Sequence, residues 1–553
     1  MDNQDERGSL AVEQAFVASI ASPSVAVSAP NVDVPPDAPM AMPVRPLTDW
    51  RGAQASAPAS SPADIVRRRS IVFGAAIIVA FLGWIATYNT MALGGVTRLE
   101  AICLTLLAPL FAALSLWFCT AVAGFMILLG KPRDPLGIDD SLPLPRPTIR
   151  TAILMPVHNE DASAVFARLR AMDASLAEAG ASNLFDMFVI SDTRDPAVAL
   201  AEQSHYVRFR REAACNVYYR LRTKNVGRKA GNVADWVRRF GGAYDAMIVL
   251  DADSLMTGDA MVRIADAMQR HPDVGLIQTM PVLINSQTVF ARCLQFATSL
   301  YGRVAWTGLA WWSGSESSFW GHNAIIRVRA FAETCGLPVL PGQRPFLLRR
   351  SGWAVHLAPY LEGSYEESPS NLLDFAARDR RWCQGNVQHM PLIGTPGLHW
   401  LSRLHLALGG LAYLLSPLWF LALSFGVVSR LLLPGLKKAA FQWADVEAAV
   451  HAMVNWREIQ ATAWAFVITA ILLFGPKILG SLLILRDRAE RAKFGGGWKI
   501  VGSLSLEMVL SALIAPLLMF TQTRALVEIL AGKDSRLARQ RRDAHIICWD
   551  EAS

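Results

Sequence analysis

The stretch VLDADSLM, residues 249–256, is an apolar run that ends in two carboxylates, Asp251 and Asp253. Polar residues at the end of a buried strand are typical of α/β sheets, because ligands bind beyond the carboxyl ends of the strands. Carboxylate oxygens are preferred ligands of Mg²⁺ and Mn²⁺, and such a cation also binds substrate phosphates. The pair therefore predicts a metal site, with a solvated turn as the alternative.

Further short apolar stretches lie between Pro147 and about Arg403, and helical patterns separate them. Strands and helices that alternate at this spacing predict an α/β domain with a largely parallel sheet. Polar residues also follow two other expected strands, at 158–161 and at Asp192. The expected strands lie within TAILMPVHNED (151–161), FDMFVISDT (185–193), NVYYRLR (216–222), AMIVLDAD (246–253) and VGLIQTMP (274–281).

The segment KNVGRKAGN, residues 224–232, places glycines on both sides of Arg228 and Lys229. Glycines permit close backbone approach to a ligand, and the two cations would neutralise a diphosphate. The segment is not a P-loop, because GxxxxGK[ST] is absent, and a basic helix start is the alternative. Asp192 could accept a hydrogen bond from a nucleobase or ribose, with a helix N-cap as its alternative.

The composition indicates a membrane protein. Of the 553 residues, 52% are hydrophobic and only 18% are charged, and the mean hydropathy is +0.28. Soluble domains carry about 25% charged residues. Apolar runs that are long enough to span a bilayer precede the domain at 71–88 and 101–129 and follow it at 404–428, 461–485 and 501–520.

Basic residues flank these runs, at 67–69, at Lys131 and Arg133, and in the loop 486–499. The positive-inside rule predicts that these flanks and the domain are cytoplasmic. The net charge of +7 beside apolar spans suits an anionic lipid bilayer, so we expect no nucleic acid partner. Five spans put the C-terminus outside, where the basic RLARQRR at 536–542 conflicts with the rule.

Three further patterns complete the expected organisation. Residues 1–63 are rich in Ala, Pro, Ser and Asp and are expected to be disordered. Apolar residues recur on one helical face of 290–312, which predicts an interfacial helix beneath the domain, with a core helix as the alternative. Lys477 and Glu507 lie inside apolar runs, where lone charges are costly, and are predicted to pair.

The expected parts are a disordered tail (1–65), two transmembrane helices (66–132), an α/β domain (147–400), about three transmembrane helices (401–530) and a C-terminal tail (531–553).

The motifs, taken in order, resemble membrane-embedded, inverting family-2 glycosyltransferases, relatives of cellulose synthase with a GT-A, Rossmann-like domain. The residues that carry this resemblance are MPVHNED (155–161), SDT (191–193), GRKAGN (227–232), DAD (251–253) and RDRRWCQGN (378–386). A closer resemblance, over roughly residues 70–550, is to the glucans biosynthesis glucosyltransferase H family, which makes the β-glucan backbone of osmoregulated periplasmic glucans. It rests on QTMPVLINSQTVFARCLQF (278–296), GHNAIIR (321–327), GSYEESPSNLLDFAARDRRWCQGN (363–386) and YLLSPLWF (413–420).

The resemblance implies a UDP-glucose site that includes Mg²⁺ or Mn²⁺. Lys229 and Asp251 would contact the diphosphate-sugar, and Asp253 would bind the metal. The acceptor would be a growing β-glucan. The catalytic domain would face the cytoplasm at the bacterial inner membrane, with a periplasmic glucan-processing protein as partner. The residues implied to line the uridine pocket are Pro156, Asn159, Glu160 and Asp192.

RDRRWCQGN matches the family's QxxRW element, with Arg378 at the Gln position. The resemblance implies that Arg378 and Arg381 hold the leaving diphosphate and that Trp382 stacks beneath the acceptor sugar. A β-1,2 linkage is implied by the resemblance alone.

The chain departs from the family where the general base is expected, between the GHN and RRW elements. It passes from GQRPF (342–346) directly to LLRRSGW (347–353), so the segment that carries the acidic base is missing. It also ends sooner after the last apolar run than the family does. We therefore expect slow or absent turnover, with Glu366 or Glu367 as the substitute base in an active chain. A catalytically silent relative that binds nucleotide or glucan and acts in regulation is the alternative.

Overall fold

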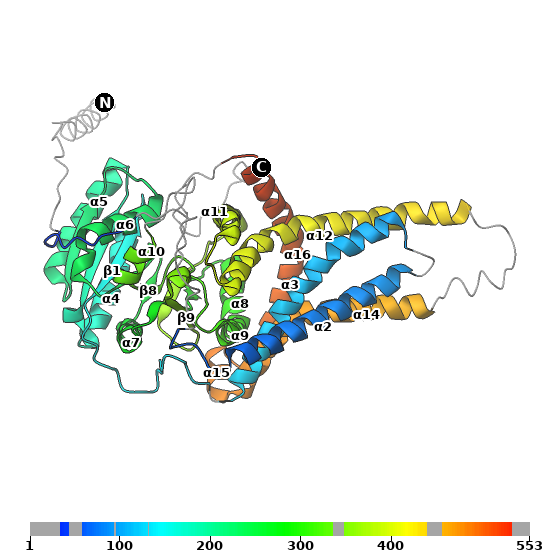
Figure 1. The fold of residues 1–553 in the computed structure, drawn as a ribbon, viewed down its shortest axis with the longest axis horizontal. Coiled ribbons are helices and arrows are strands. Elements are labelled where there is room, and N and C mark those ends of the chain that lie inside the picture. The colour runs from blue at the N-terminus through cyan, green and yellow to red at the C-terminus, as the bar shows by residue number, and fades with distance from the viewer. Residues whose placement is uncertain are drawn as a thin grey trace, which may run out of the picture.

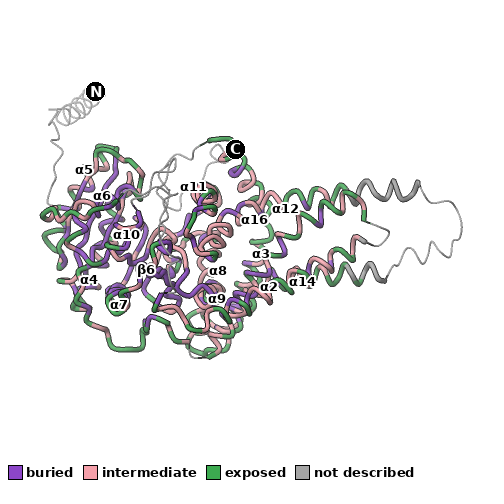
Figure 2. Tube along the Cα trace, in the orientation of Figure 1, coloured by how far each residue is buried: buried purple, intermediate pink, exposed green. Residues whose placement is uncertain are grey.

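The computed structural model describes residues 34–43, 58–92, 96–130, 132–335, 348–439 and 456–533. An α/β domain occupies one end of the molecule, and long helices project from the other end (Figure 1). Buried residues concentrate in the domain, whereas the outer parts of the long helices are mostly exposed or intermediate (Figure 2). Large apolar side chains such as Ile77, Phe81 and Phe466 are exposed on these helices, as expected for contact with lipid.

The main sheet has seven strands in the order β3-β2-β1-β4-β8-β6-β9. All neighbours are parallel except β8, which runs antiparallel to β4 and β6. The prediction of an α/β domain with a largely parallel sheet is confirmed. The strands are β1 (Thr151–Val157), β2 (Phe185–Ser191), β3 (Asn216–Leu221), β4 (Ala246–Val249), β6 (Val274–Thr279), β8 (Ala324–Arg327) and β9 (Ala354–Ala358).

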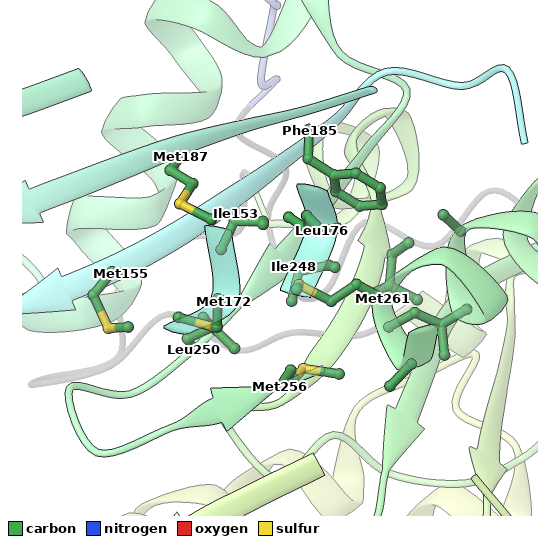
Figure 3. Packing of buried hydrophobic residues seen from close by; sticks show 14 of the residues in the cluster. Ile153, Met155, Met172, Leu176, Phe185, Met187, Ile248, Leu250, Met256 and Met261 are labelled. Atoms are coloured by element: carbon green, nitrogen blue, oxygen red, sulfur yellow. The ribbon is translucent and has the colours of Figure 1, made fainter. Parts of the chain in front are cut away.

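Helices cover both faces of this sheet. One face packs against α4 (Ala162–Glu178), α5 (Pro196–Glu212) and α7 (Gly258–Arg270). Figure 3 shows part of this core, in which methionines from strands and helices lie among other apolar side chains. The other face packs against α6 (Arg228–Phe240) and α10 (Val328–Thr334). Parallel strands with both faces covered leave the carboxyl edge as the place for a site.

A second sheet of three short strands, in the order β5-β10-β7, lies beside that edge. Its strands are β5 (Leu255–Met256), β7 (Val282–Ile284) and β10 (Ser364–Glu367). β10 is antiparallel to β5 and parallel to β7. This pairing brings the GSYEE segment next to the residues that follow the Asp-x-Asp pair.

Part of the N-terminal tail is ordered against the domain. The N–H of Ala38 donates to the carbonyl of Arg239 at 3.0 Å, and Met42 is buried in the core beneath α6. Ser60 donates from its amide and hydroxyl to Asp273, at 2.8 and 2.7 Å. The prediction that 1–65 is disordered is therefore wrong for 34–43 and 58–64, because Met42 packs into the core beneath α6 and Ser60 hydrogen-bonds to Asp273.

The segment 290–312 forms α8 (Val289–Ala297), a π-helical turn (Thr298–Gly302) and α9 (Arg303–Ser313) between the domain and the long helices. α9 crosses α3 (Arg98–Leu128) at Gly124 and Gly308, where an added Cβ would lie 1.8–1.9 Å from a backbone oxygen of the other helix. Only glycine fits at such a crossing. The segment predicted to be an interfacial helix is thus two helices joined by a π-helical turn, and its second helix packs directly against α3.

Five helices in the described part are long and apolar enough to cross a membrane: α2 (Ile65–Ala92), α3, α12 (Trp400–Ala439), α14 (Trp456–Arg486) and α16 (Gly497–Leu530). α15 (Arg488–Lys493) joins the last two, and α11 (Leu372–His389) precedes α12. Lys477 on α14 donates to Glu507 on α16 at 2.8 Å. The predicted ion pair is confirmed.

α16 does not run as the count of five spans predicted. Ile500, near its start, packs with Leu300 of the π-helical turn, and Gln522, near its end, donates to Asp379 on α11. Both ends therefore lie beside elements of the domain, and α16 crosses the other long helices in Figure 1. The end of α16 thus lies beside α11, while the C-terminal tail from 534 on, whose side was predicted, lies outside the described residues.

Candidate active site

Lys229 links three loops at the carboxyl edge of the sheet. It is the second residue of α6, which begins after Gly227 in the left-handed region at φ 75°. Its ammonium group pairs with Asp251, which follows β4, and donates to the carbonyl of Gly321 at 2.7 Å. The Asp-x-Asp pair, the GRKAGN segment and the GHN segment thus meet at one point, as the two sequence motifs predict.

Asp251 and Asp253 lie on a tight turn. The Asp251 amide donates to the Ser254 hydroxyl at 2.8 Å, and the Ser254 amide donates to the Asp251 carbonyl at 3.0 Å. Asp253 is buried and Asp251 is partly exposed. Within the described ranges no group of three or more His, Cys, Asp or Glu residues could hold a metal. Two carboxylates fit Mg²⁺ or Mn²⁺, because such ions are typically held by one or two carboxylates and complete their shells with water and substrate phosphates.

Asp192 is engaged by a residue that sequence reasoning missed. Arg222, just beyond β3, donates to both oxygens of Asp192 at 2.7 Å. The same guanidinium donates to the carbonyls of Val226 and Arg228, at 3.1 and 3.2 Å. Asp192 is therefore not the N-cap of α5, a role that Asp195 fills. Its bidentate pair with Arg222 fixes the loop that precedes α6.

The residues after β1 form the adjoining wall. Pro156 lies within β1, and Glu160 is partly buried in the loop that follows. Asn159 has a positive φ of 54°, and its side-chain oxygen accepts from the amides of Arg194 and Asp195 at 3.0 and 3.1 Å. Asn159 thus holds the loops after β1 and β2 together. All four residues expected around the uridine lie at this part of the edge.

The structure separates the two candidate bases. Consecutive residues of a strand point to opposite faces, and Glu366 and Glu367 do so on β10. Glu367 pairs with Arg168 of α4 at 2.8 Å and accepts from Asn285 at 3.2 Å. Glu366 instead lies 3.3 Å from the ring Nε2 of His322. Glu367 is therefore committed to an ion pair, and we retain Glu366 alone as a candidate base.

Electrostatics place Glu366 in the site. Burial raises the pKa of its carboxyl, and the charges of Asp253 and Asp251 raise it further, whereas His322 and Arg378 oppose the shift. A carboxyl whose pKa is raised by burial next to specific charges is typical of a group that handles protons. The two carboxylates of the expected metal site thus lie within electrostatic reach of Glu366.

The helix α11 presents Arg378 and Trp382 together. The two residues are four positions apart, and the Arg378 guanidinium lies 4.6 Å from the centre of the Trp382 ring. Arg378 also donates to the carbonyl of Glu367 at 3.4 Å. Trp382 is 46% exposed, and Arg381 is partly buried on the same helix. An exposed indole face beside a guanidinium suits a sugar that lies next to a phosphate.

Arg222, His322 and Arg168 were missed by the sequence analysis. Arg222 follows a strand, so the rule that found Asp192 could also have found it. His322 lies in the GHN element, but no pattern in the sequence pairs it with Glu366. Residues 336–347, where the sequence predicts that the base segment is missing, lie outside the described residues, so that expectation is not tested there.

Comparison with known proteins agrees with this geometry. The family model for glycosyl transferase family 2 matches residues 152–335, and that for glycosyl transferase family group 2 matches 246–476. Over 94% of its length the chain is 66% identical to a glucans biosynthesis glucosyltransferase H from Caulobacter vibrioides (strain NA1000 / CB15N), and it covers 80% of that protein. The chain belongs to the glucans biosynthesis glucosyltransferase H family.

Other members are less similar over comparable lengths. A Rhodopseudomonas palustris (strain TIE-1) member is 46% identical, with 91% of this chain and 70% of the relative covered. A Xylella fastidiosa (strain 9a5c) member is 41% identical, with 93% and 82% covered. Among solved structures, a mannosyltransferase from Pyrobaculum calidifontis in complex with GDP-Man and Mn2+ gives a TM-score of 0.42 at 17% identity, covering 68% of this chain and 99% of that one. The last likeness is too low to carry an argument.

The family assignment identifies the α/β domain as a GT-A glycosyltransferase domain, flanked by apolar helices in a membrane protein. It also favours an active hexosyltransferase over a catalytically silent relative. A nucleotide-sugar donor, a glucan acceptor and a divalent metal are consistent with this family and with the groups that meet at the carboxyl edge.

Proposed function

We propose that the chain is an inverting glucosyltransferase that polymerises glucose from UDP-glucose into the β-glucan backbone of osmoregulated periplasmic glucans. The observation that carries the proposal is the 66% identity over 94% of the chain to a glucans biosynthesis glucosyltransferase H. The meeting of Lys229, the Asp-x-Asp pair and Glu366 at one edge of the sheet supports it.

The donor would bind along the carboxyl ends of β1, β2 and β4. Asn159 and the Asp192–Arg222 pair would hold the loops around the nucleoside, with Pro156 and Glu160 lining its pocket. Lys229 would move from Asp251 towards the diphosphate, because a diphosphate carries more negative charge than one carboxylate. Freed from Lys229, Asp251 would contact the sugar diphosphate, next to the metal site.

Asp253 would hold Mg²⁺ or Mn²⁺, with Asp251 as a second ligand. When bound, the cation would neutralise charge that develops on the departing diphosphate. Arg378 and Arg381 would add positive charge on the α11 side of the leaving group. The two cationic sides would thus face the same diphosphate from opposite ends of the cleft.

Glu366 would act as the general base. An inverting transfer needs the acceptor hydroxyl to lose its proton as its oxygen attacks the anomeric carbon and the bond to the diphosphate breaks. Glu366 would accept that proton, and His322 at 3.3 Å would keep its carboxylate oriented. The acceptor sugar would stack on Trp382 so that its hydroxyl faces Glu366.

We further propose that the catalytic domain faces the cytoplasm at the bacterial inner membrane. The basic loop 486–499 and Arg67–Arg69 lie at the domain end of the apolar helices, where the positive-inside rule expects the cytoplasm. A glucan-processing protein on the opposite side of the membrane would receive the product.

The test is to incubate the full chain, purified into nanodiscs, with labelled UDP-glucose and Mg²⁺, and to analyse the linkage of the product. We expect labelled β-glucan and UDP release, both lost when the metal is removed with a chelator. Tight UDP binding without consumption of UDP-glucose would overturn the proposal and restore the silent-relative alternative.

A further inference from the structure

The helix that carries Arg378 and Trp382 has a second, buried face. Asp379 and Cys383, also four residues apart, are both buried on this face of α11. Cys383 packs with Tyr413 of α12 and Leu526 of α16. One face of α11 therefore borders the proposed acceptor site, and the adjacent face is buried against two of the long apolar helices.

A hydrogen-bond chain crosses this buried interface. The hydroxyl of Tyr413 donates to one oxygen of Asp379 at 3.1 Å, and the side-chain amide of Gln522 donates to the other oxygen at 2.8 Å. The Ser416 hydroxyl in turn donates to the carbonyl oxygen of Gln522. Asp379 thus joins α11 to α12 and α16 at the same time.

A second link lies nearly two turns nearer the end of α16. Arg380 pairs with Glu528 at 3.1 Å, and Glu528 also pairs with Arg524 at 3.0 Å. α16 is therefore fastened to α11 at two points on its last turns, while its first turns pack under the π-helical turn. This explains why α16 crosses the bundle: its two ends are held by two different elements of the domain.

A buried carboxylate is a costly way to hold three helices together. Well-packed apolar residues of similar volume often stabilise such an interface equally well or better. A polar network specifies a single arrangement, because any shift leaves a buried donor or acceptor without a partner. Asp379 lies within the Arg378–Trp382 segment, so the arrangement that it fixes is that of the acceptor platform.

We infer that Asp379, Tyr413 and Gln522 are positioning residues that hold Arg378 and Trp382 in register with α12 and α16, and that they set how many sugars are added before the chain is released. The inference rests on the proposed function, because it assumes that Trp382 binds the acceptor. Lys229, Asp251 and Asp253 lie outside this network, so donor binding depends on it only through the arginines of α11.

An exchange of partners tests the network. Gln522→Glu places a second carboxylate against Asp379, so the two groups repel and the α11–α16 contact opens. Asp379→Asn alone is mild, because the Gln522 amide can rotate to accept from the new amide and donate to Ser416. In the double variant the new amide at position 379 donates to the new carboxylate at position 522. Tyr413 and Ser416 keep their acceptors there, so every hydrogen bond is restored.

The measurements are UDP affinity, initial UDP release and product length from labelled UDP-glucose. For Gln522→Glu we expect a mean product length about tenfold shorter, which corresponds to the loss of one hydrogen bond to a charged group, and a clearly smaller loss of UDP affinity. The double variant should regain most of the length. Gln203→Glu on the surface of α5 is the matched control and should change neither quantity.

Hydrogen exchange of the α11 amides gives a readout that does not need turnover. Exchange should speed up in Gln522→Glu and return to the wild-type rate in the double variant. Unchanged exchange, failure of the second substitution to rescue, or an equal loss of UDP affinity and product length would each overturn the inference. If the wild-type protein makes no glucan while the double variant still restores the wild-type exchange rate, the coupling stands and the proposed function is overturned instead.

Discussion

The two sides of the proposed cleft are built in different ways. The donor side consists of short loops after parallel strands, where Lys229 meets Asp251 and the Gly321 carbonyl. The acceptor side consists of helices, where Asp379 meets partners 34 and 143 residues away in the sequence. Strand topology alone brings donor residues to one edge, whereas acceptor residues depend on side-chain complementarity between helices. Substitutions on the two sides should therefore fail in different ways.

The largest effect is expected on the donor side, at Asp253. Asp253→Asn should abolish Mg²⁺-dependent UDP binding, because a neutral amide is a poor ligand for a hard cation. The measurement is UDP affinity with and without Mg²⁺, by calorimetry on the full chain in nanodiscs. Asp259→Asn, an exposed aspartate on α7, is the control. Unchanged Mg²⁺-dependent affinity in Asp253→Asn would remove the metal-site assignment.

The next effect is expected where the two sides meet, at Glu366. Glu366→Gln should lower the turnover number by about 10²–10⁴-fold, the typical contribution of a positioned general base, with UDP affinity nearly unchanged. Glu367→Gln is the matched control at the neighbouring position. It should mainly lower the unfolding temperature, because it breaks the pair with Arg168. Similar turnover in both variants would show that neither carboxylate is the base.

A substitution of Trp382, on the acceptor side, should affect the length of the product more than the binding of UDP. Trp382→Ala should shorten the product about tenfold while UDP affinity stays within about twofold, because stacking on an aromatic face is worth roughly 1–3 kcal/mol. Trp382→Phe keeps a ring at this position and should retain most of the product length. The measurement is the length distribution of labelled glucan. Parallel loss of UDP affinity and length in Trp382→Ala would point to a folding defect.

The sequence predicts well which residues meet at the carboxyl edge, and the reason is physical. Parallel strands end at the same edge of a sheet, so charged residues that follow them lie close together. Local patterns were therefore enough to place Asp251, Asp192 and Lys229 near one another. Arg222 follows the same rule and was overlooked. The opposite orientations of Glu366 and Glu367 follow from strand geometry, but only once β10 is known to be a strand.

The acceptor side and the N-terminal tail were predicted less well. The hydropathy pattern predicts α16 as an apolar span, but it carries no information about the contacts of Gln522 and Glu528 with α11. These contacts make the helix cross the bundle. The tail is polar overall, but its few apolar residues include Met42, which packs into the buried cluster beneath α6. In both cases the outcome depends on a partner far away in the sequence, which no local pattern describes.

The smallest effect is expected at the ion pair behind the acceptor side. Glu507 accepts from Lys477 at 2.8 Å and from Ser511 at 2.7 Å, and the Lys477 ammonium lies 5.6 Å from the centre of the Tyr301 ring in the π-helical turn. Charges buried in a membrane protein are costly when unpaired. Each single change, Lys477→Met or Glu507→Gln, leaves a lone polar partner, whereas the double change removes both charges.

The double variant should therefore be less destabilised than the sum of the two single variants, with a coupling free energy of about 1 kcal/mol. The coupling is measured by a double-mutant cycle, in which the wild type, the two single variants and the double variant are thermally unfolded in the same detergent. The exposed pair Lys493–Glu490 on α15 is the comparison and should couple by only about 0.3–0.5 kcal/mol, because water screens it. If Lys477→Met and Glu507→Gln add without coupling, the pair does not hold α14 against α16, and the crossing of α16 depends on the contacts of its two ends with the π-helical turn and α11.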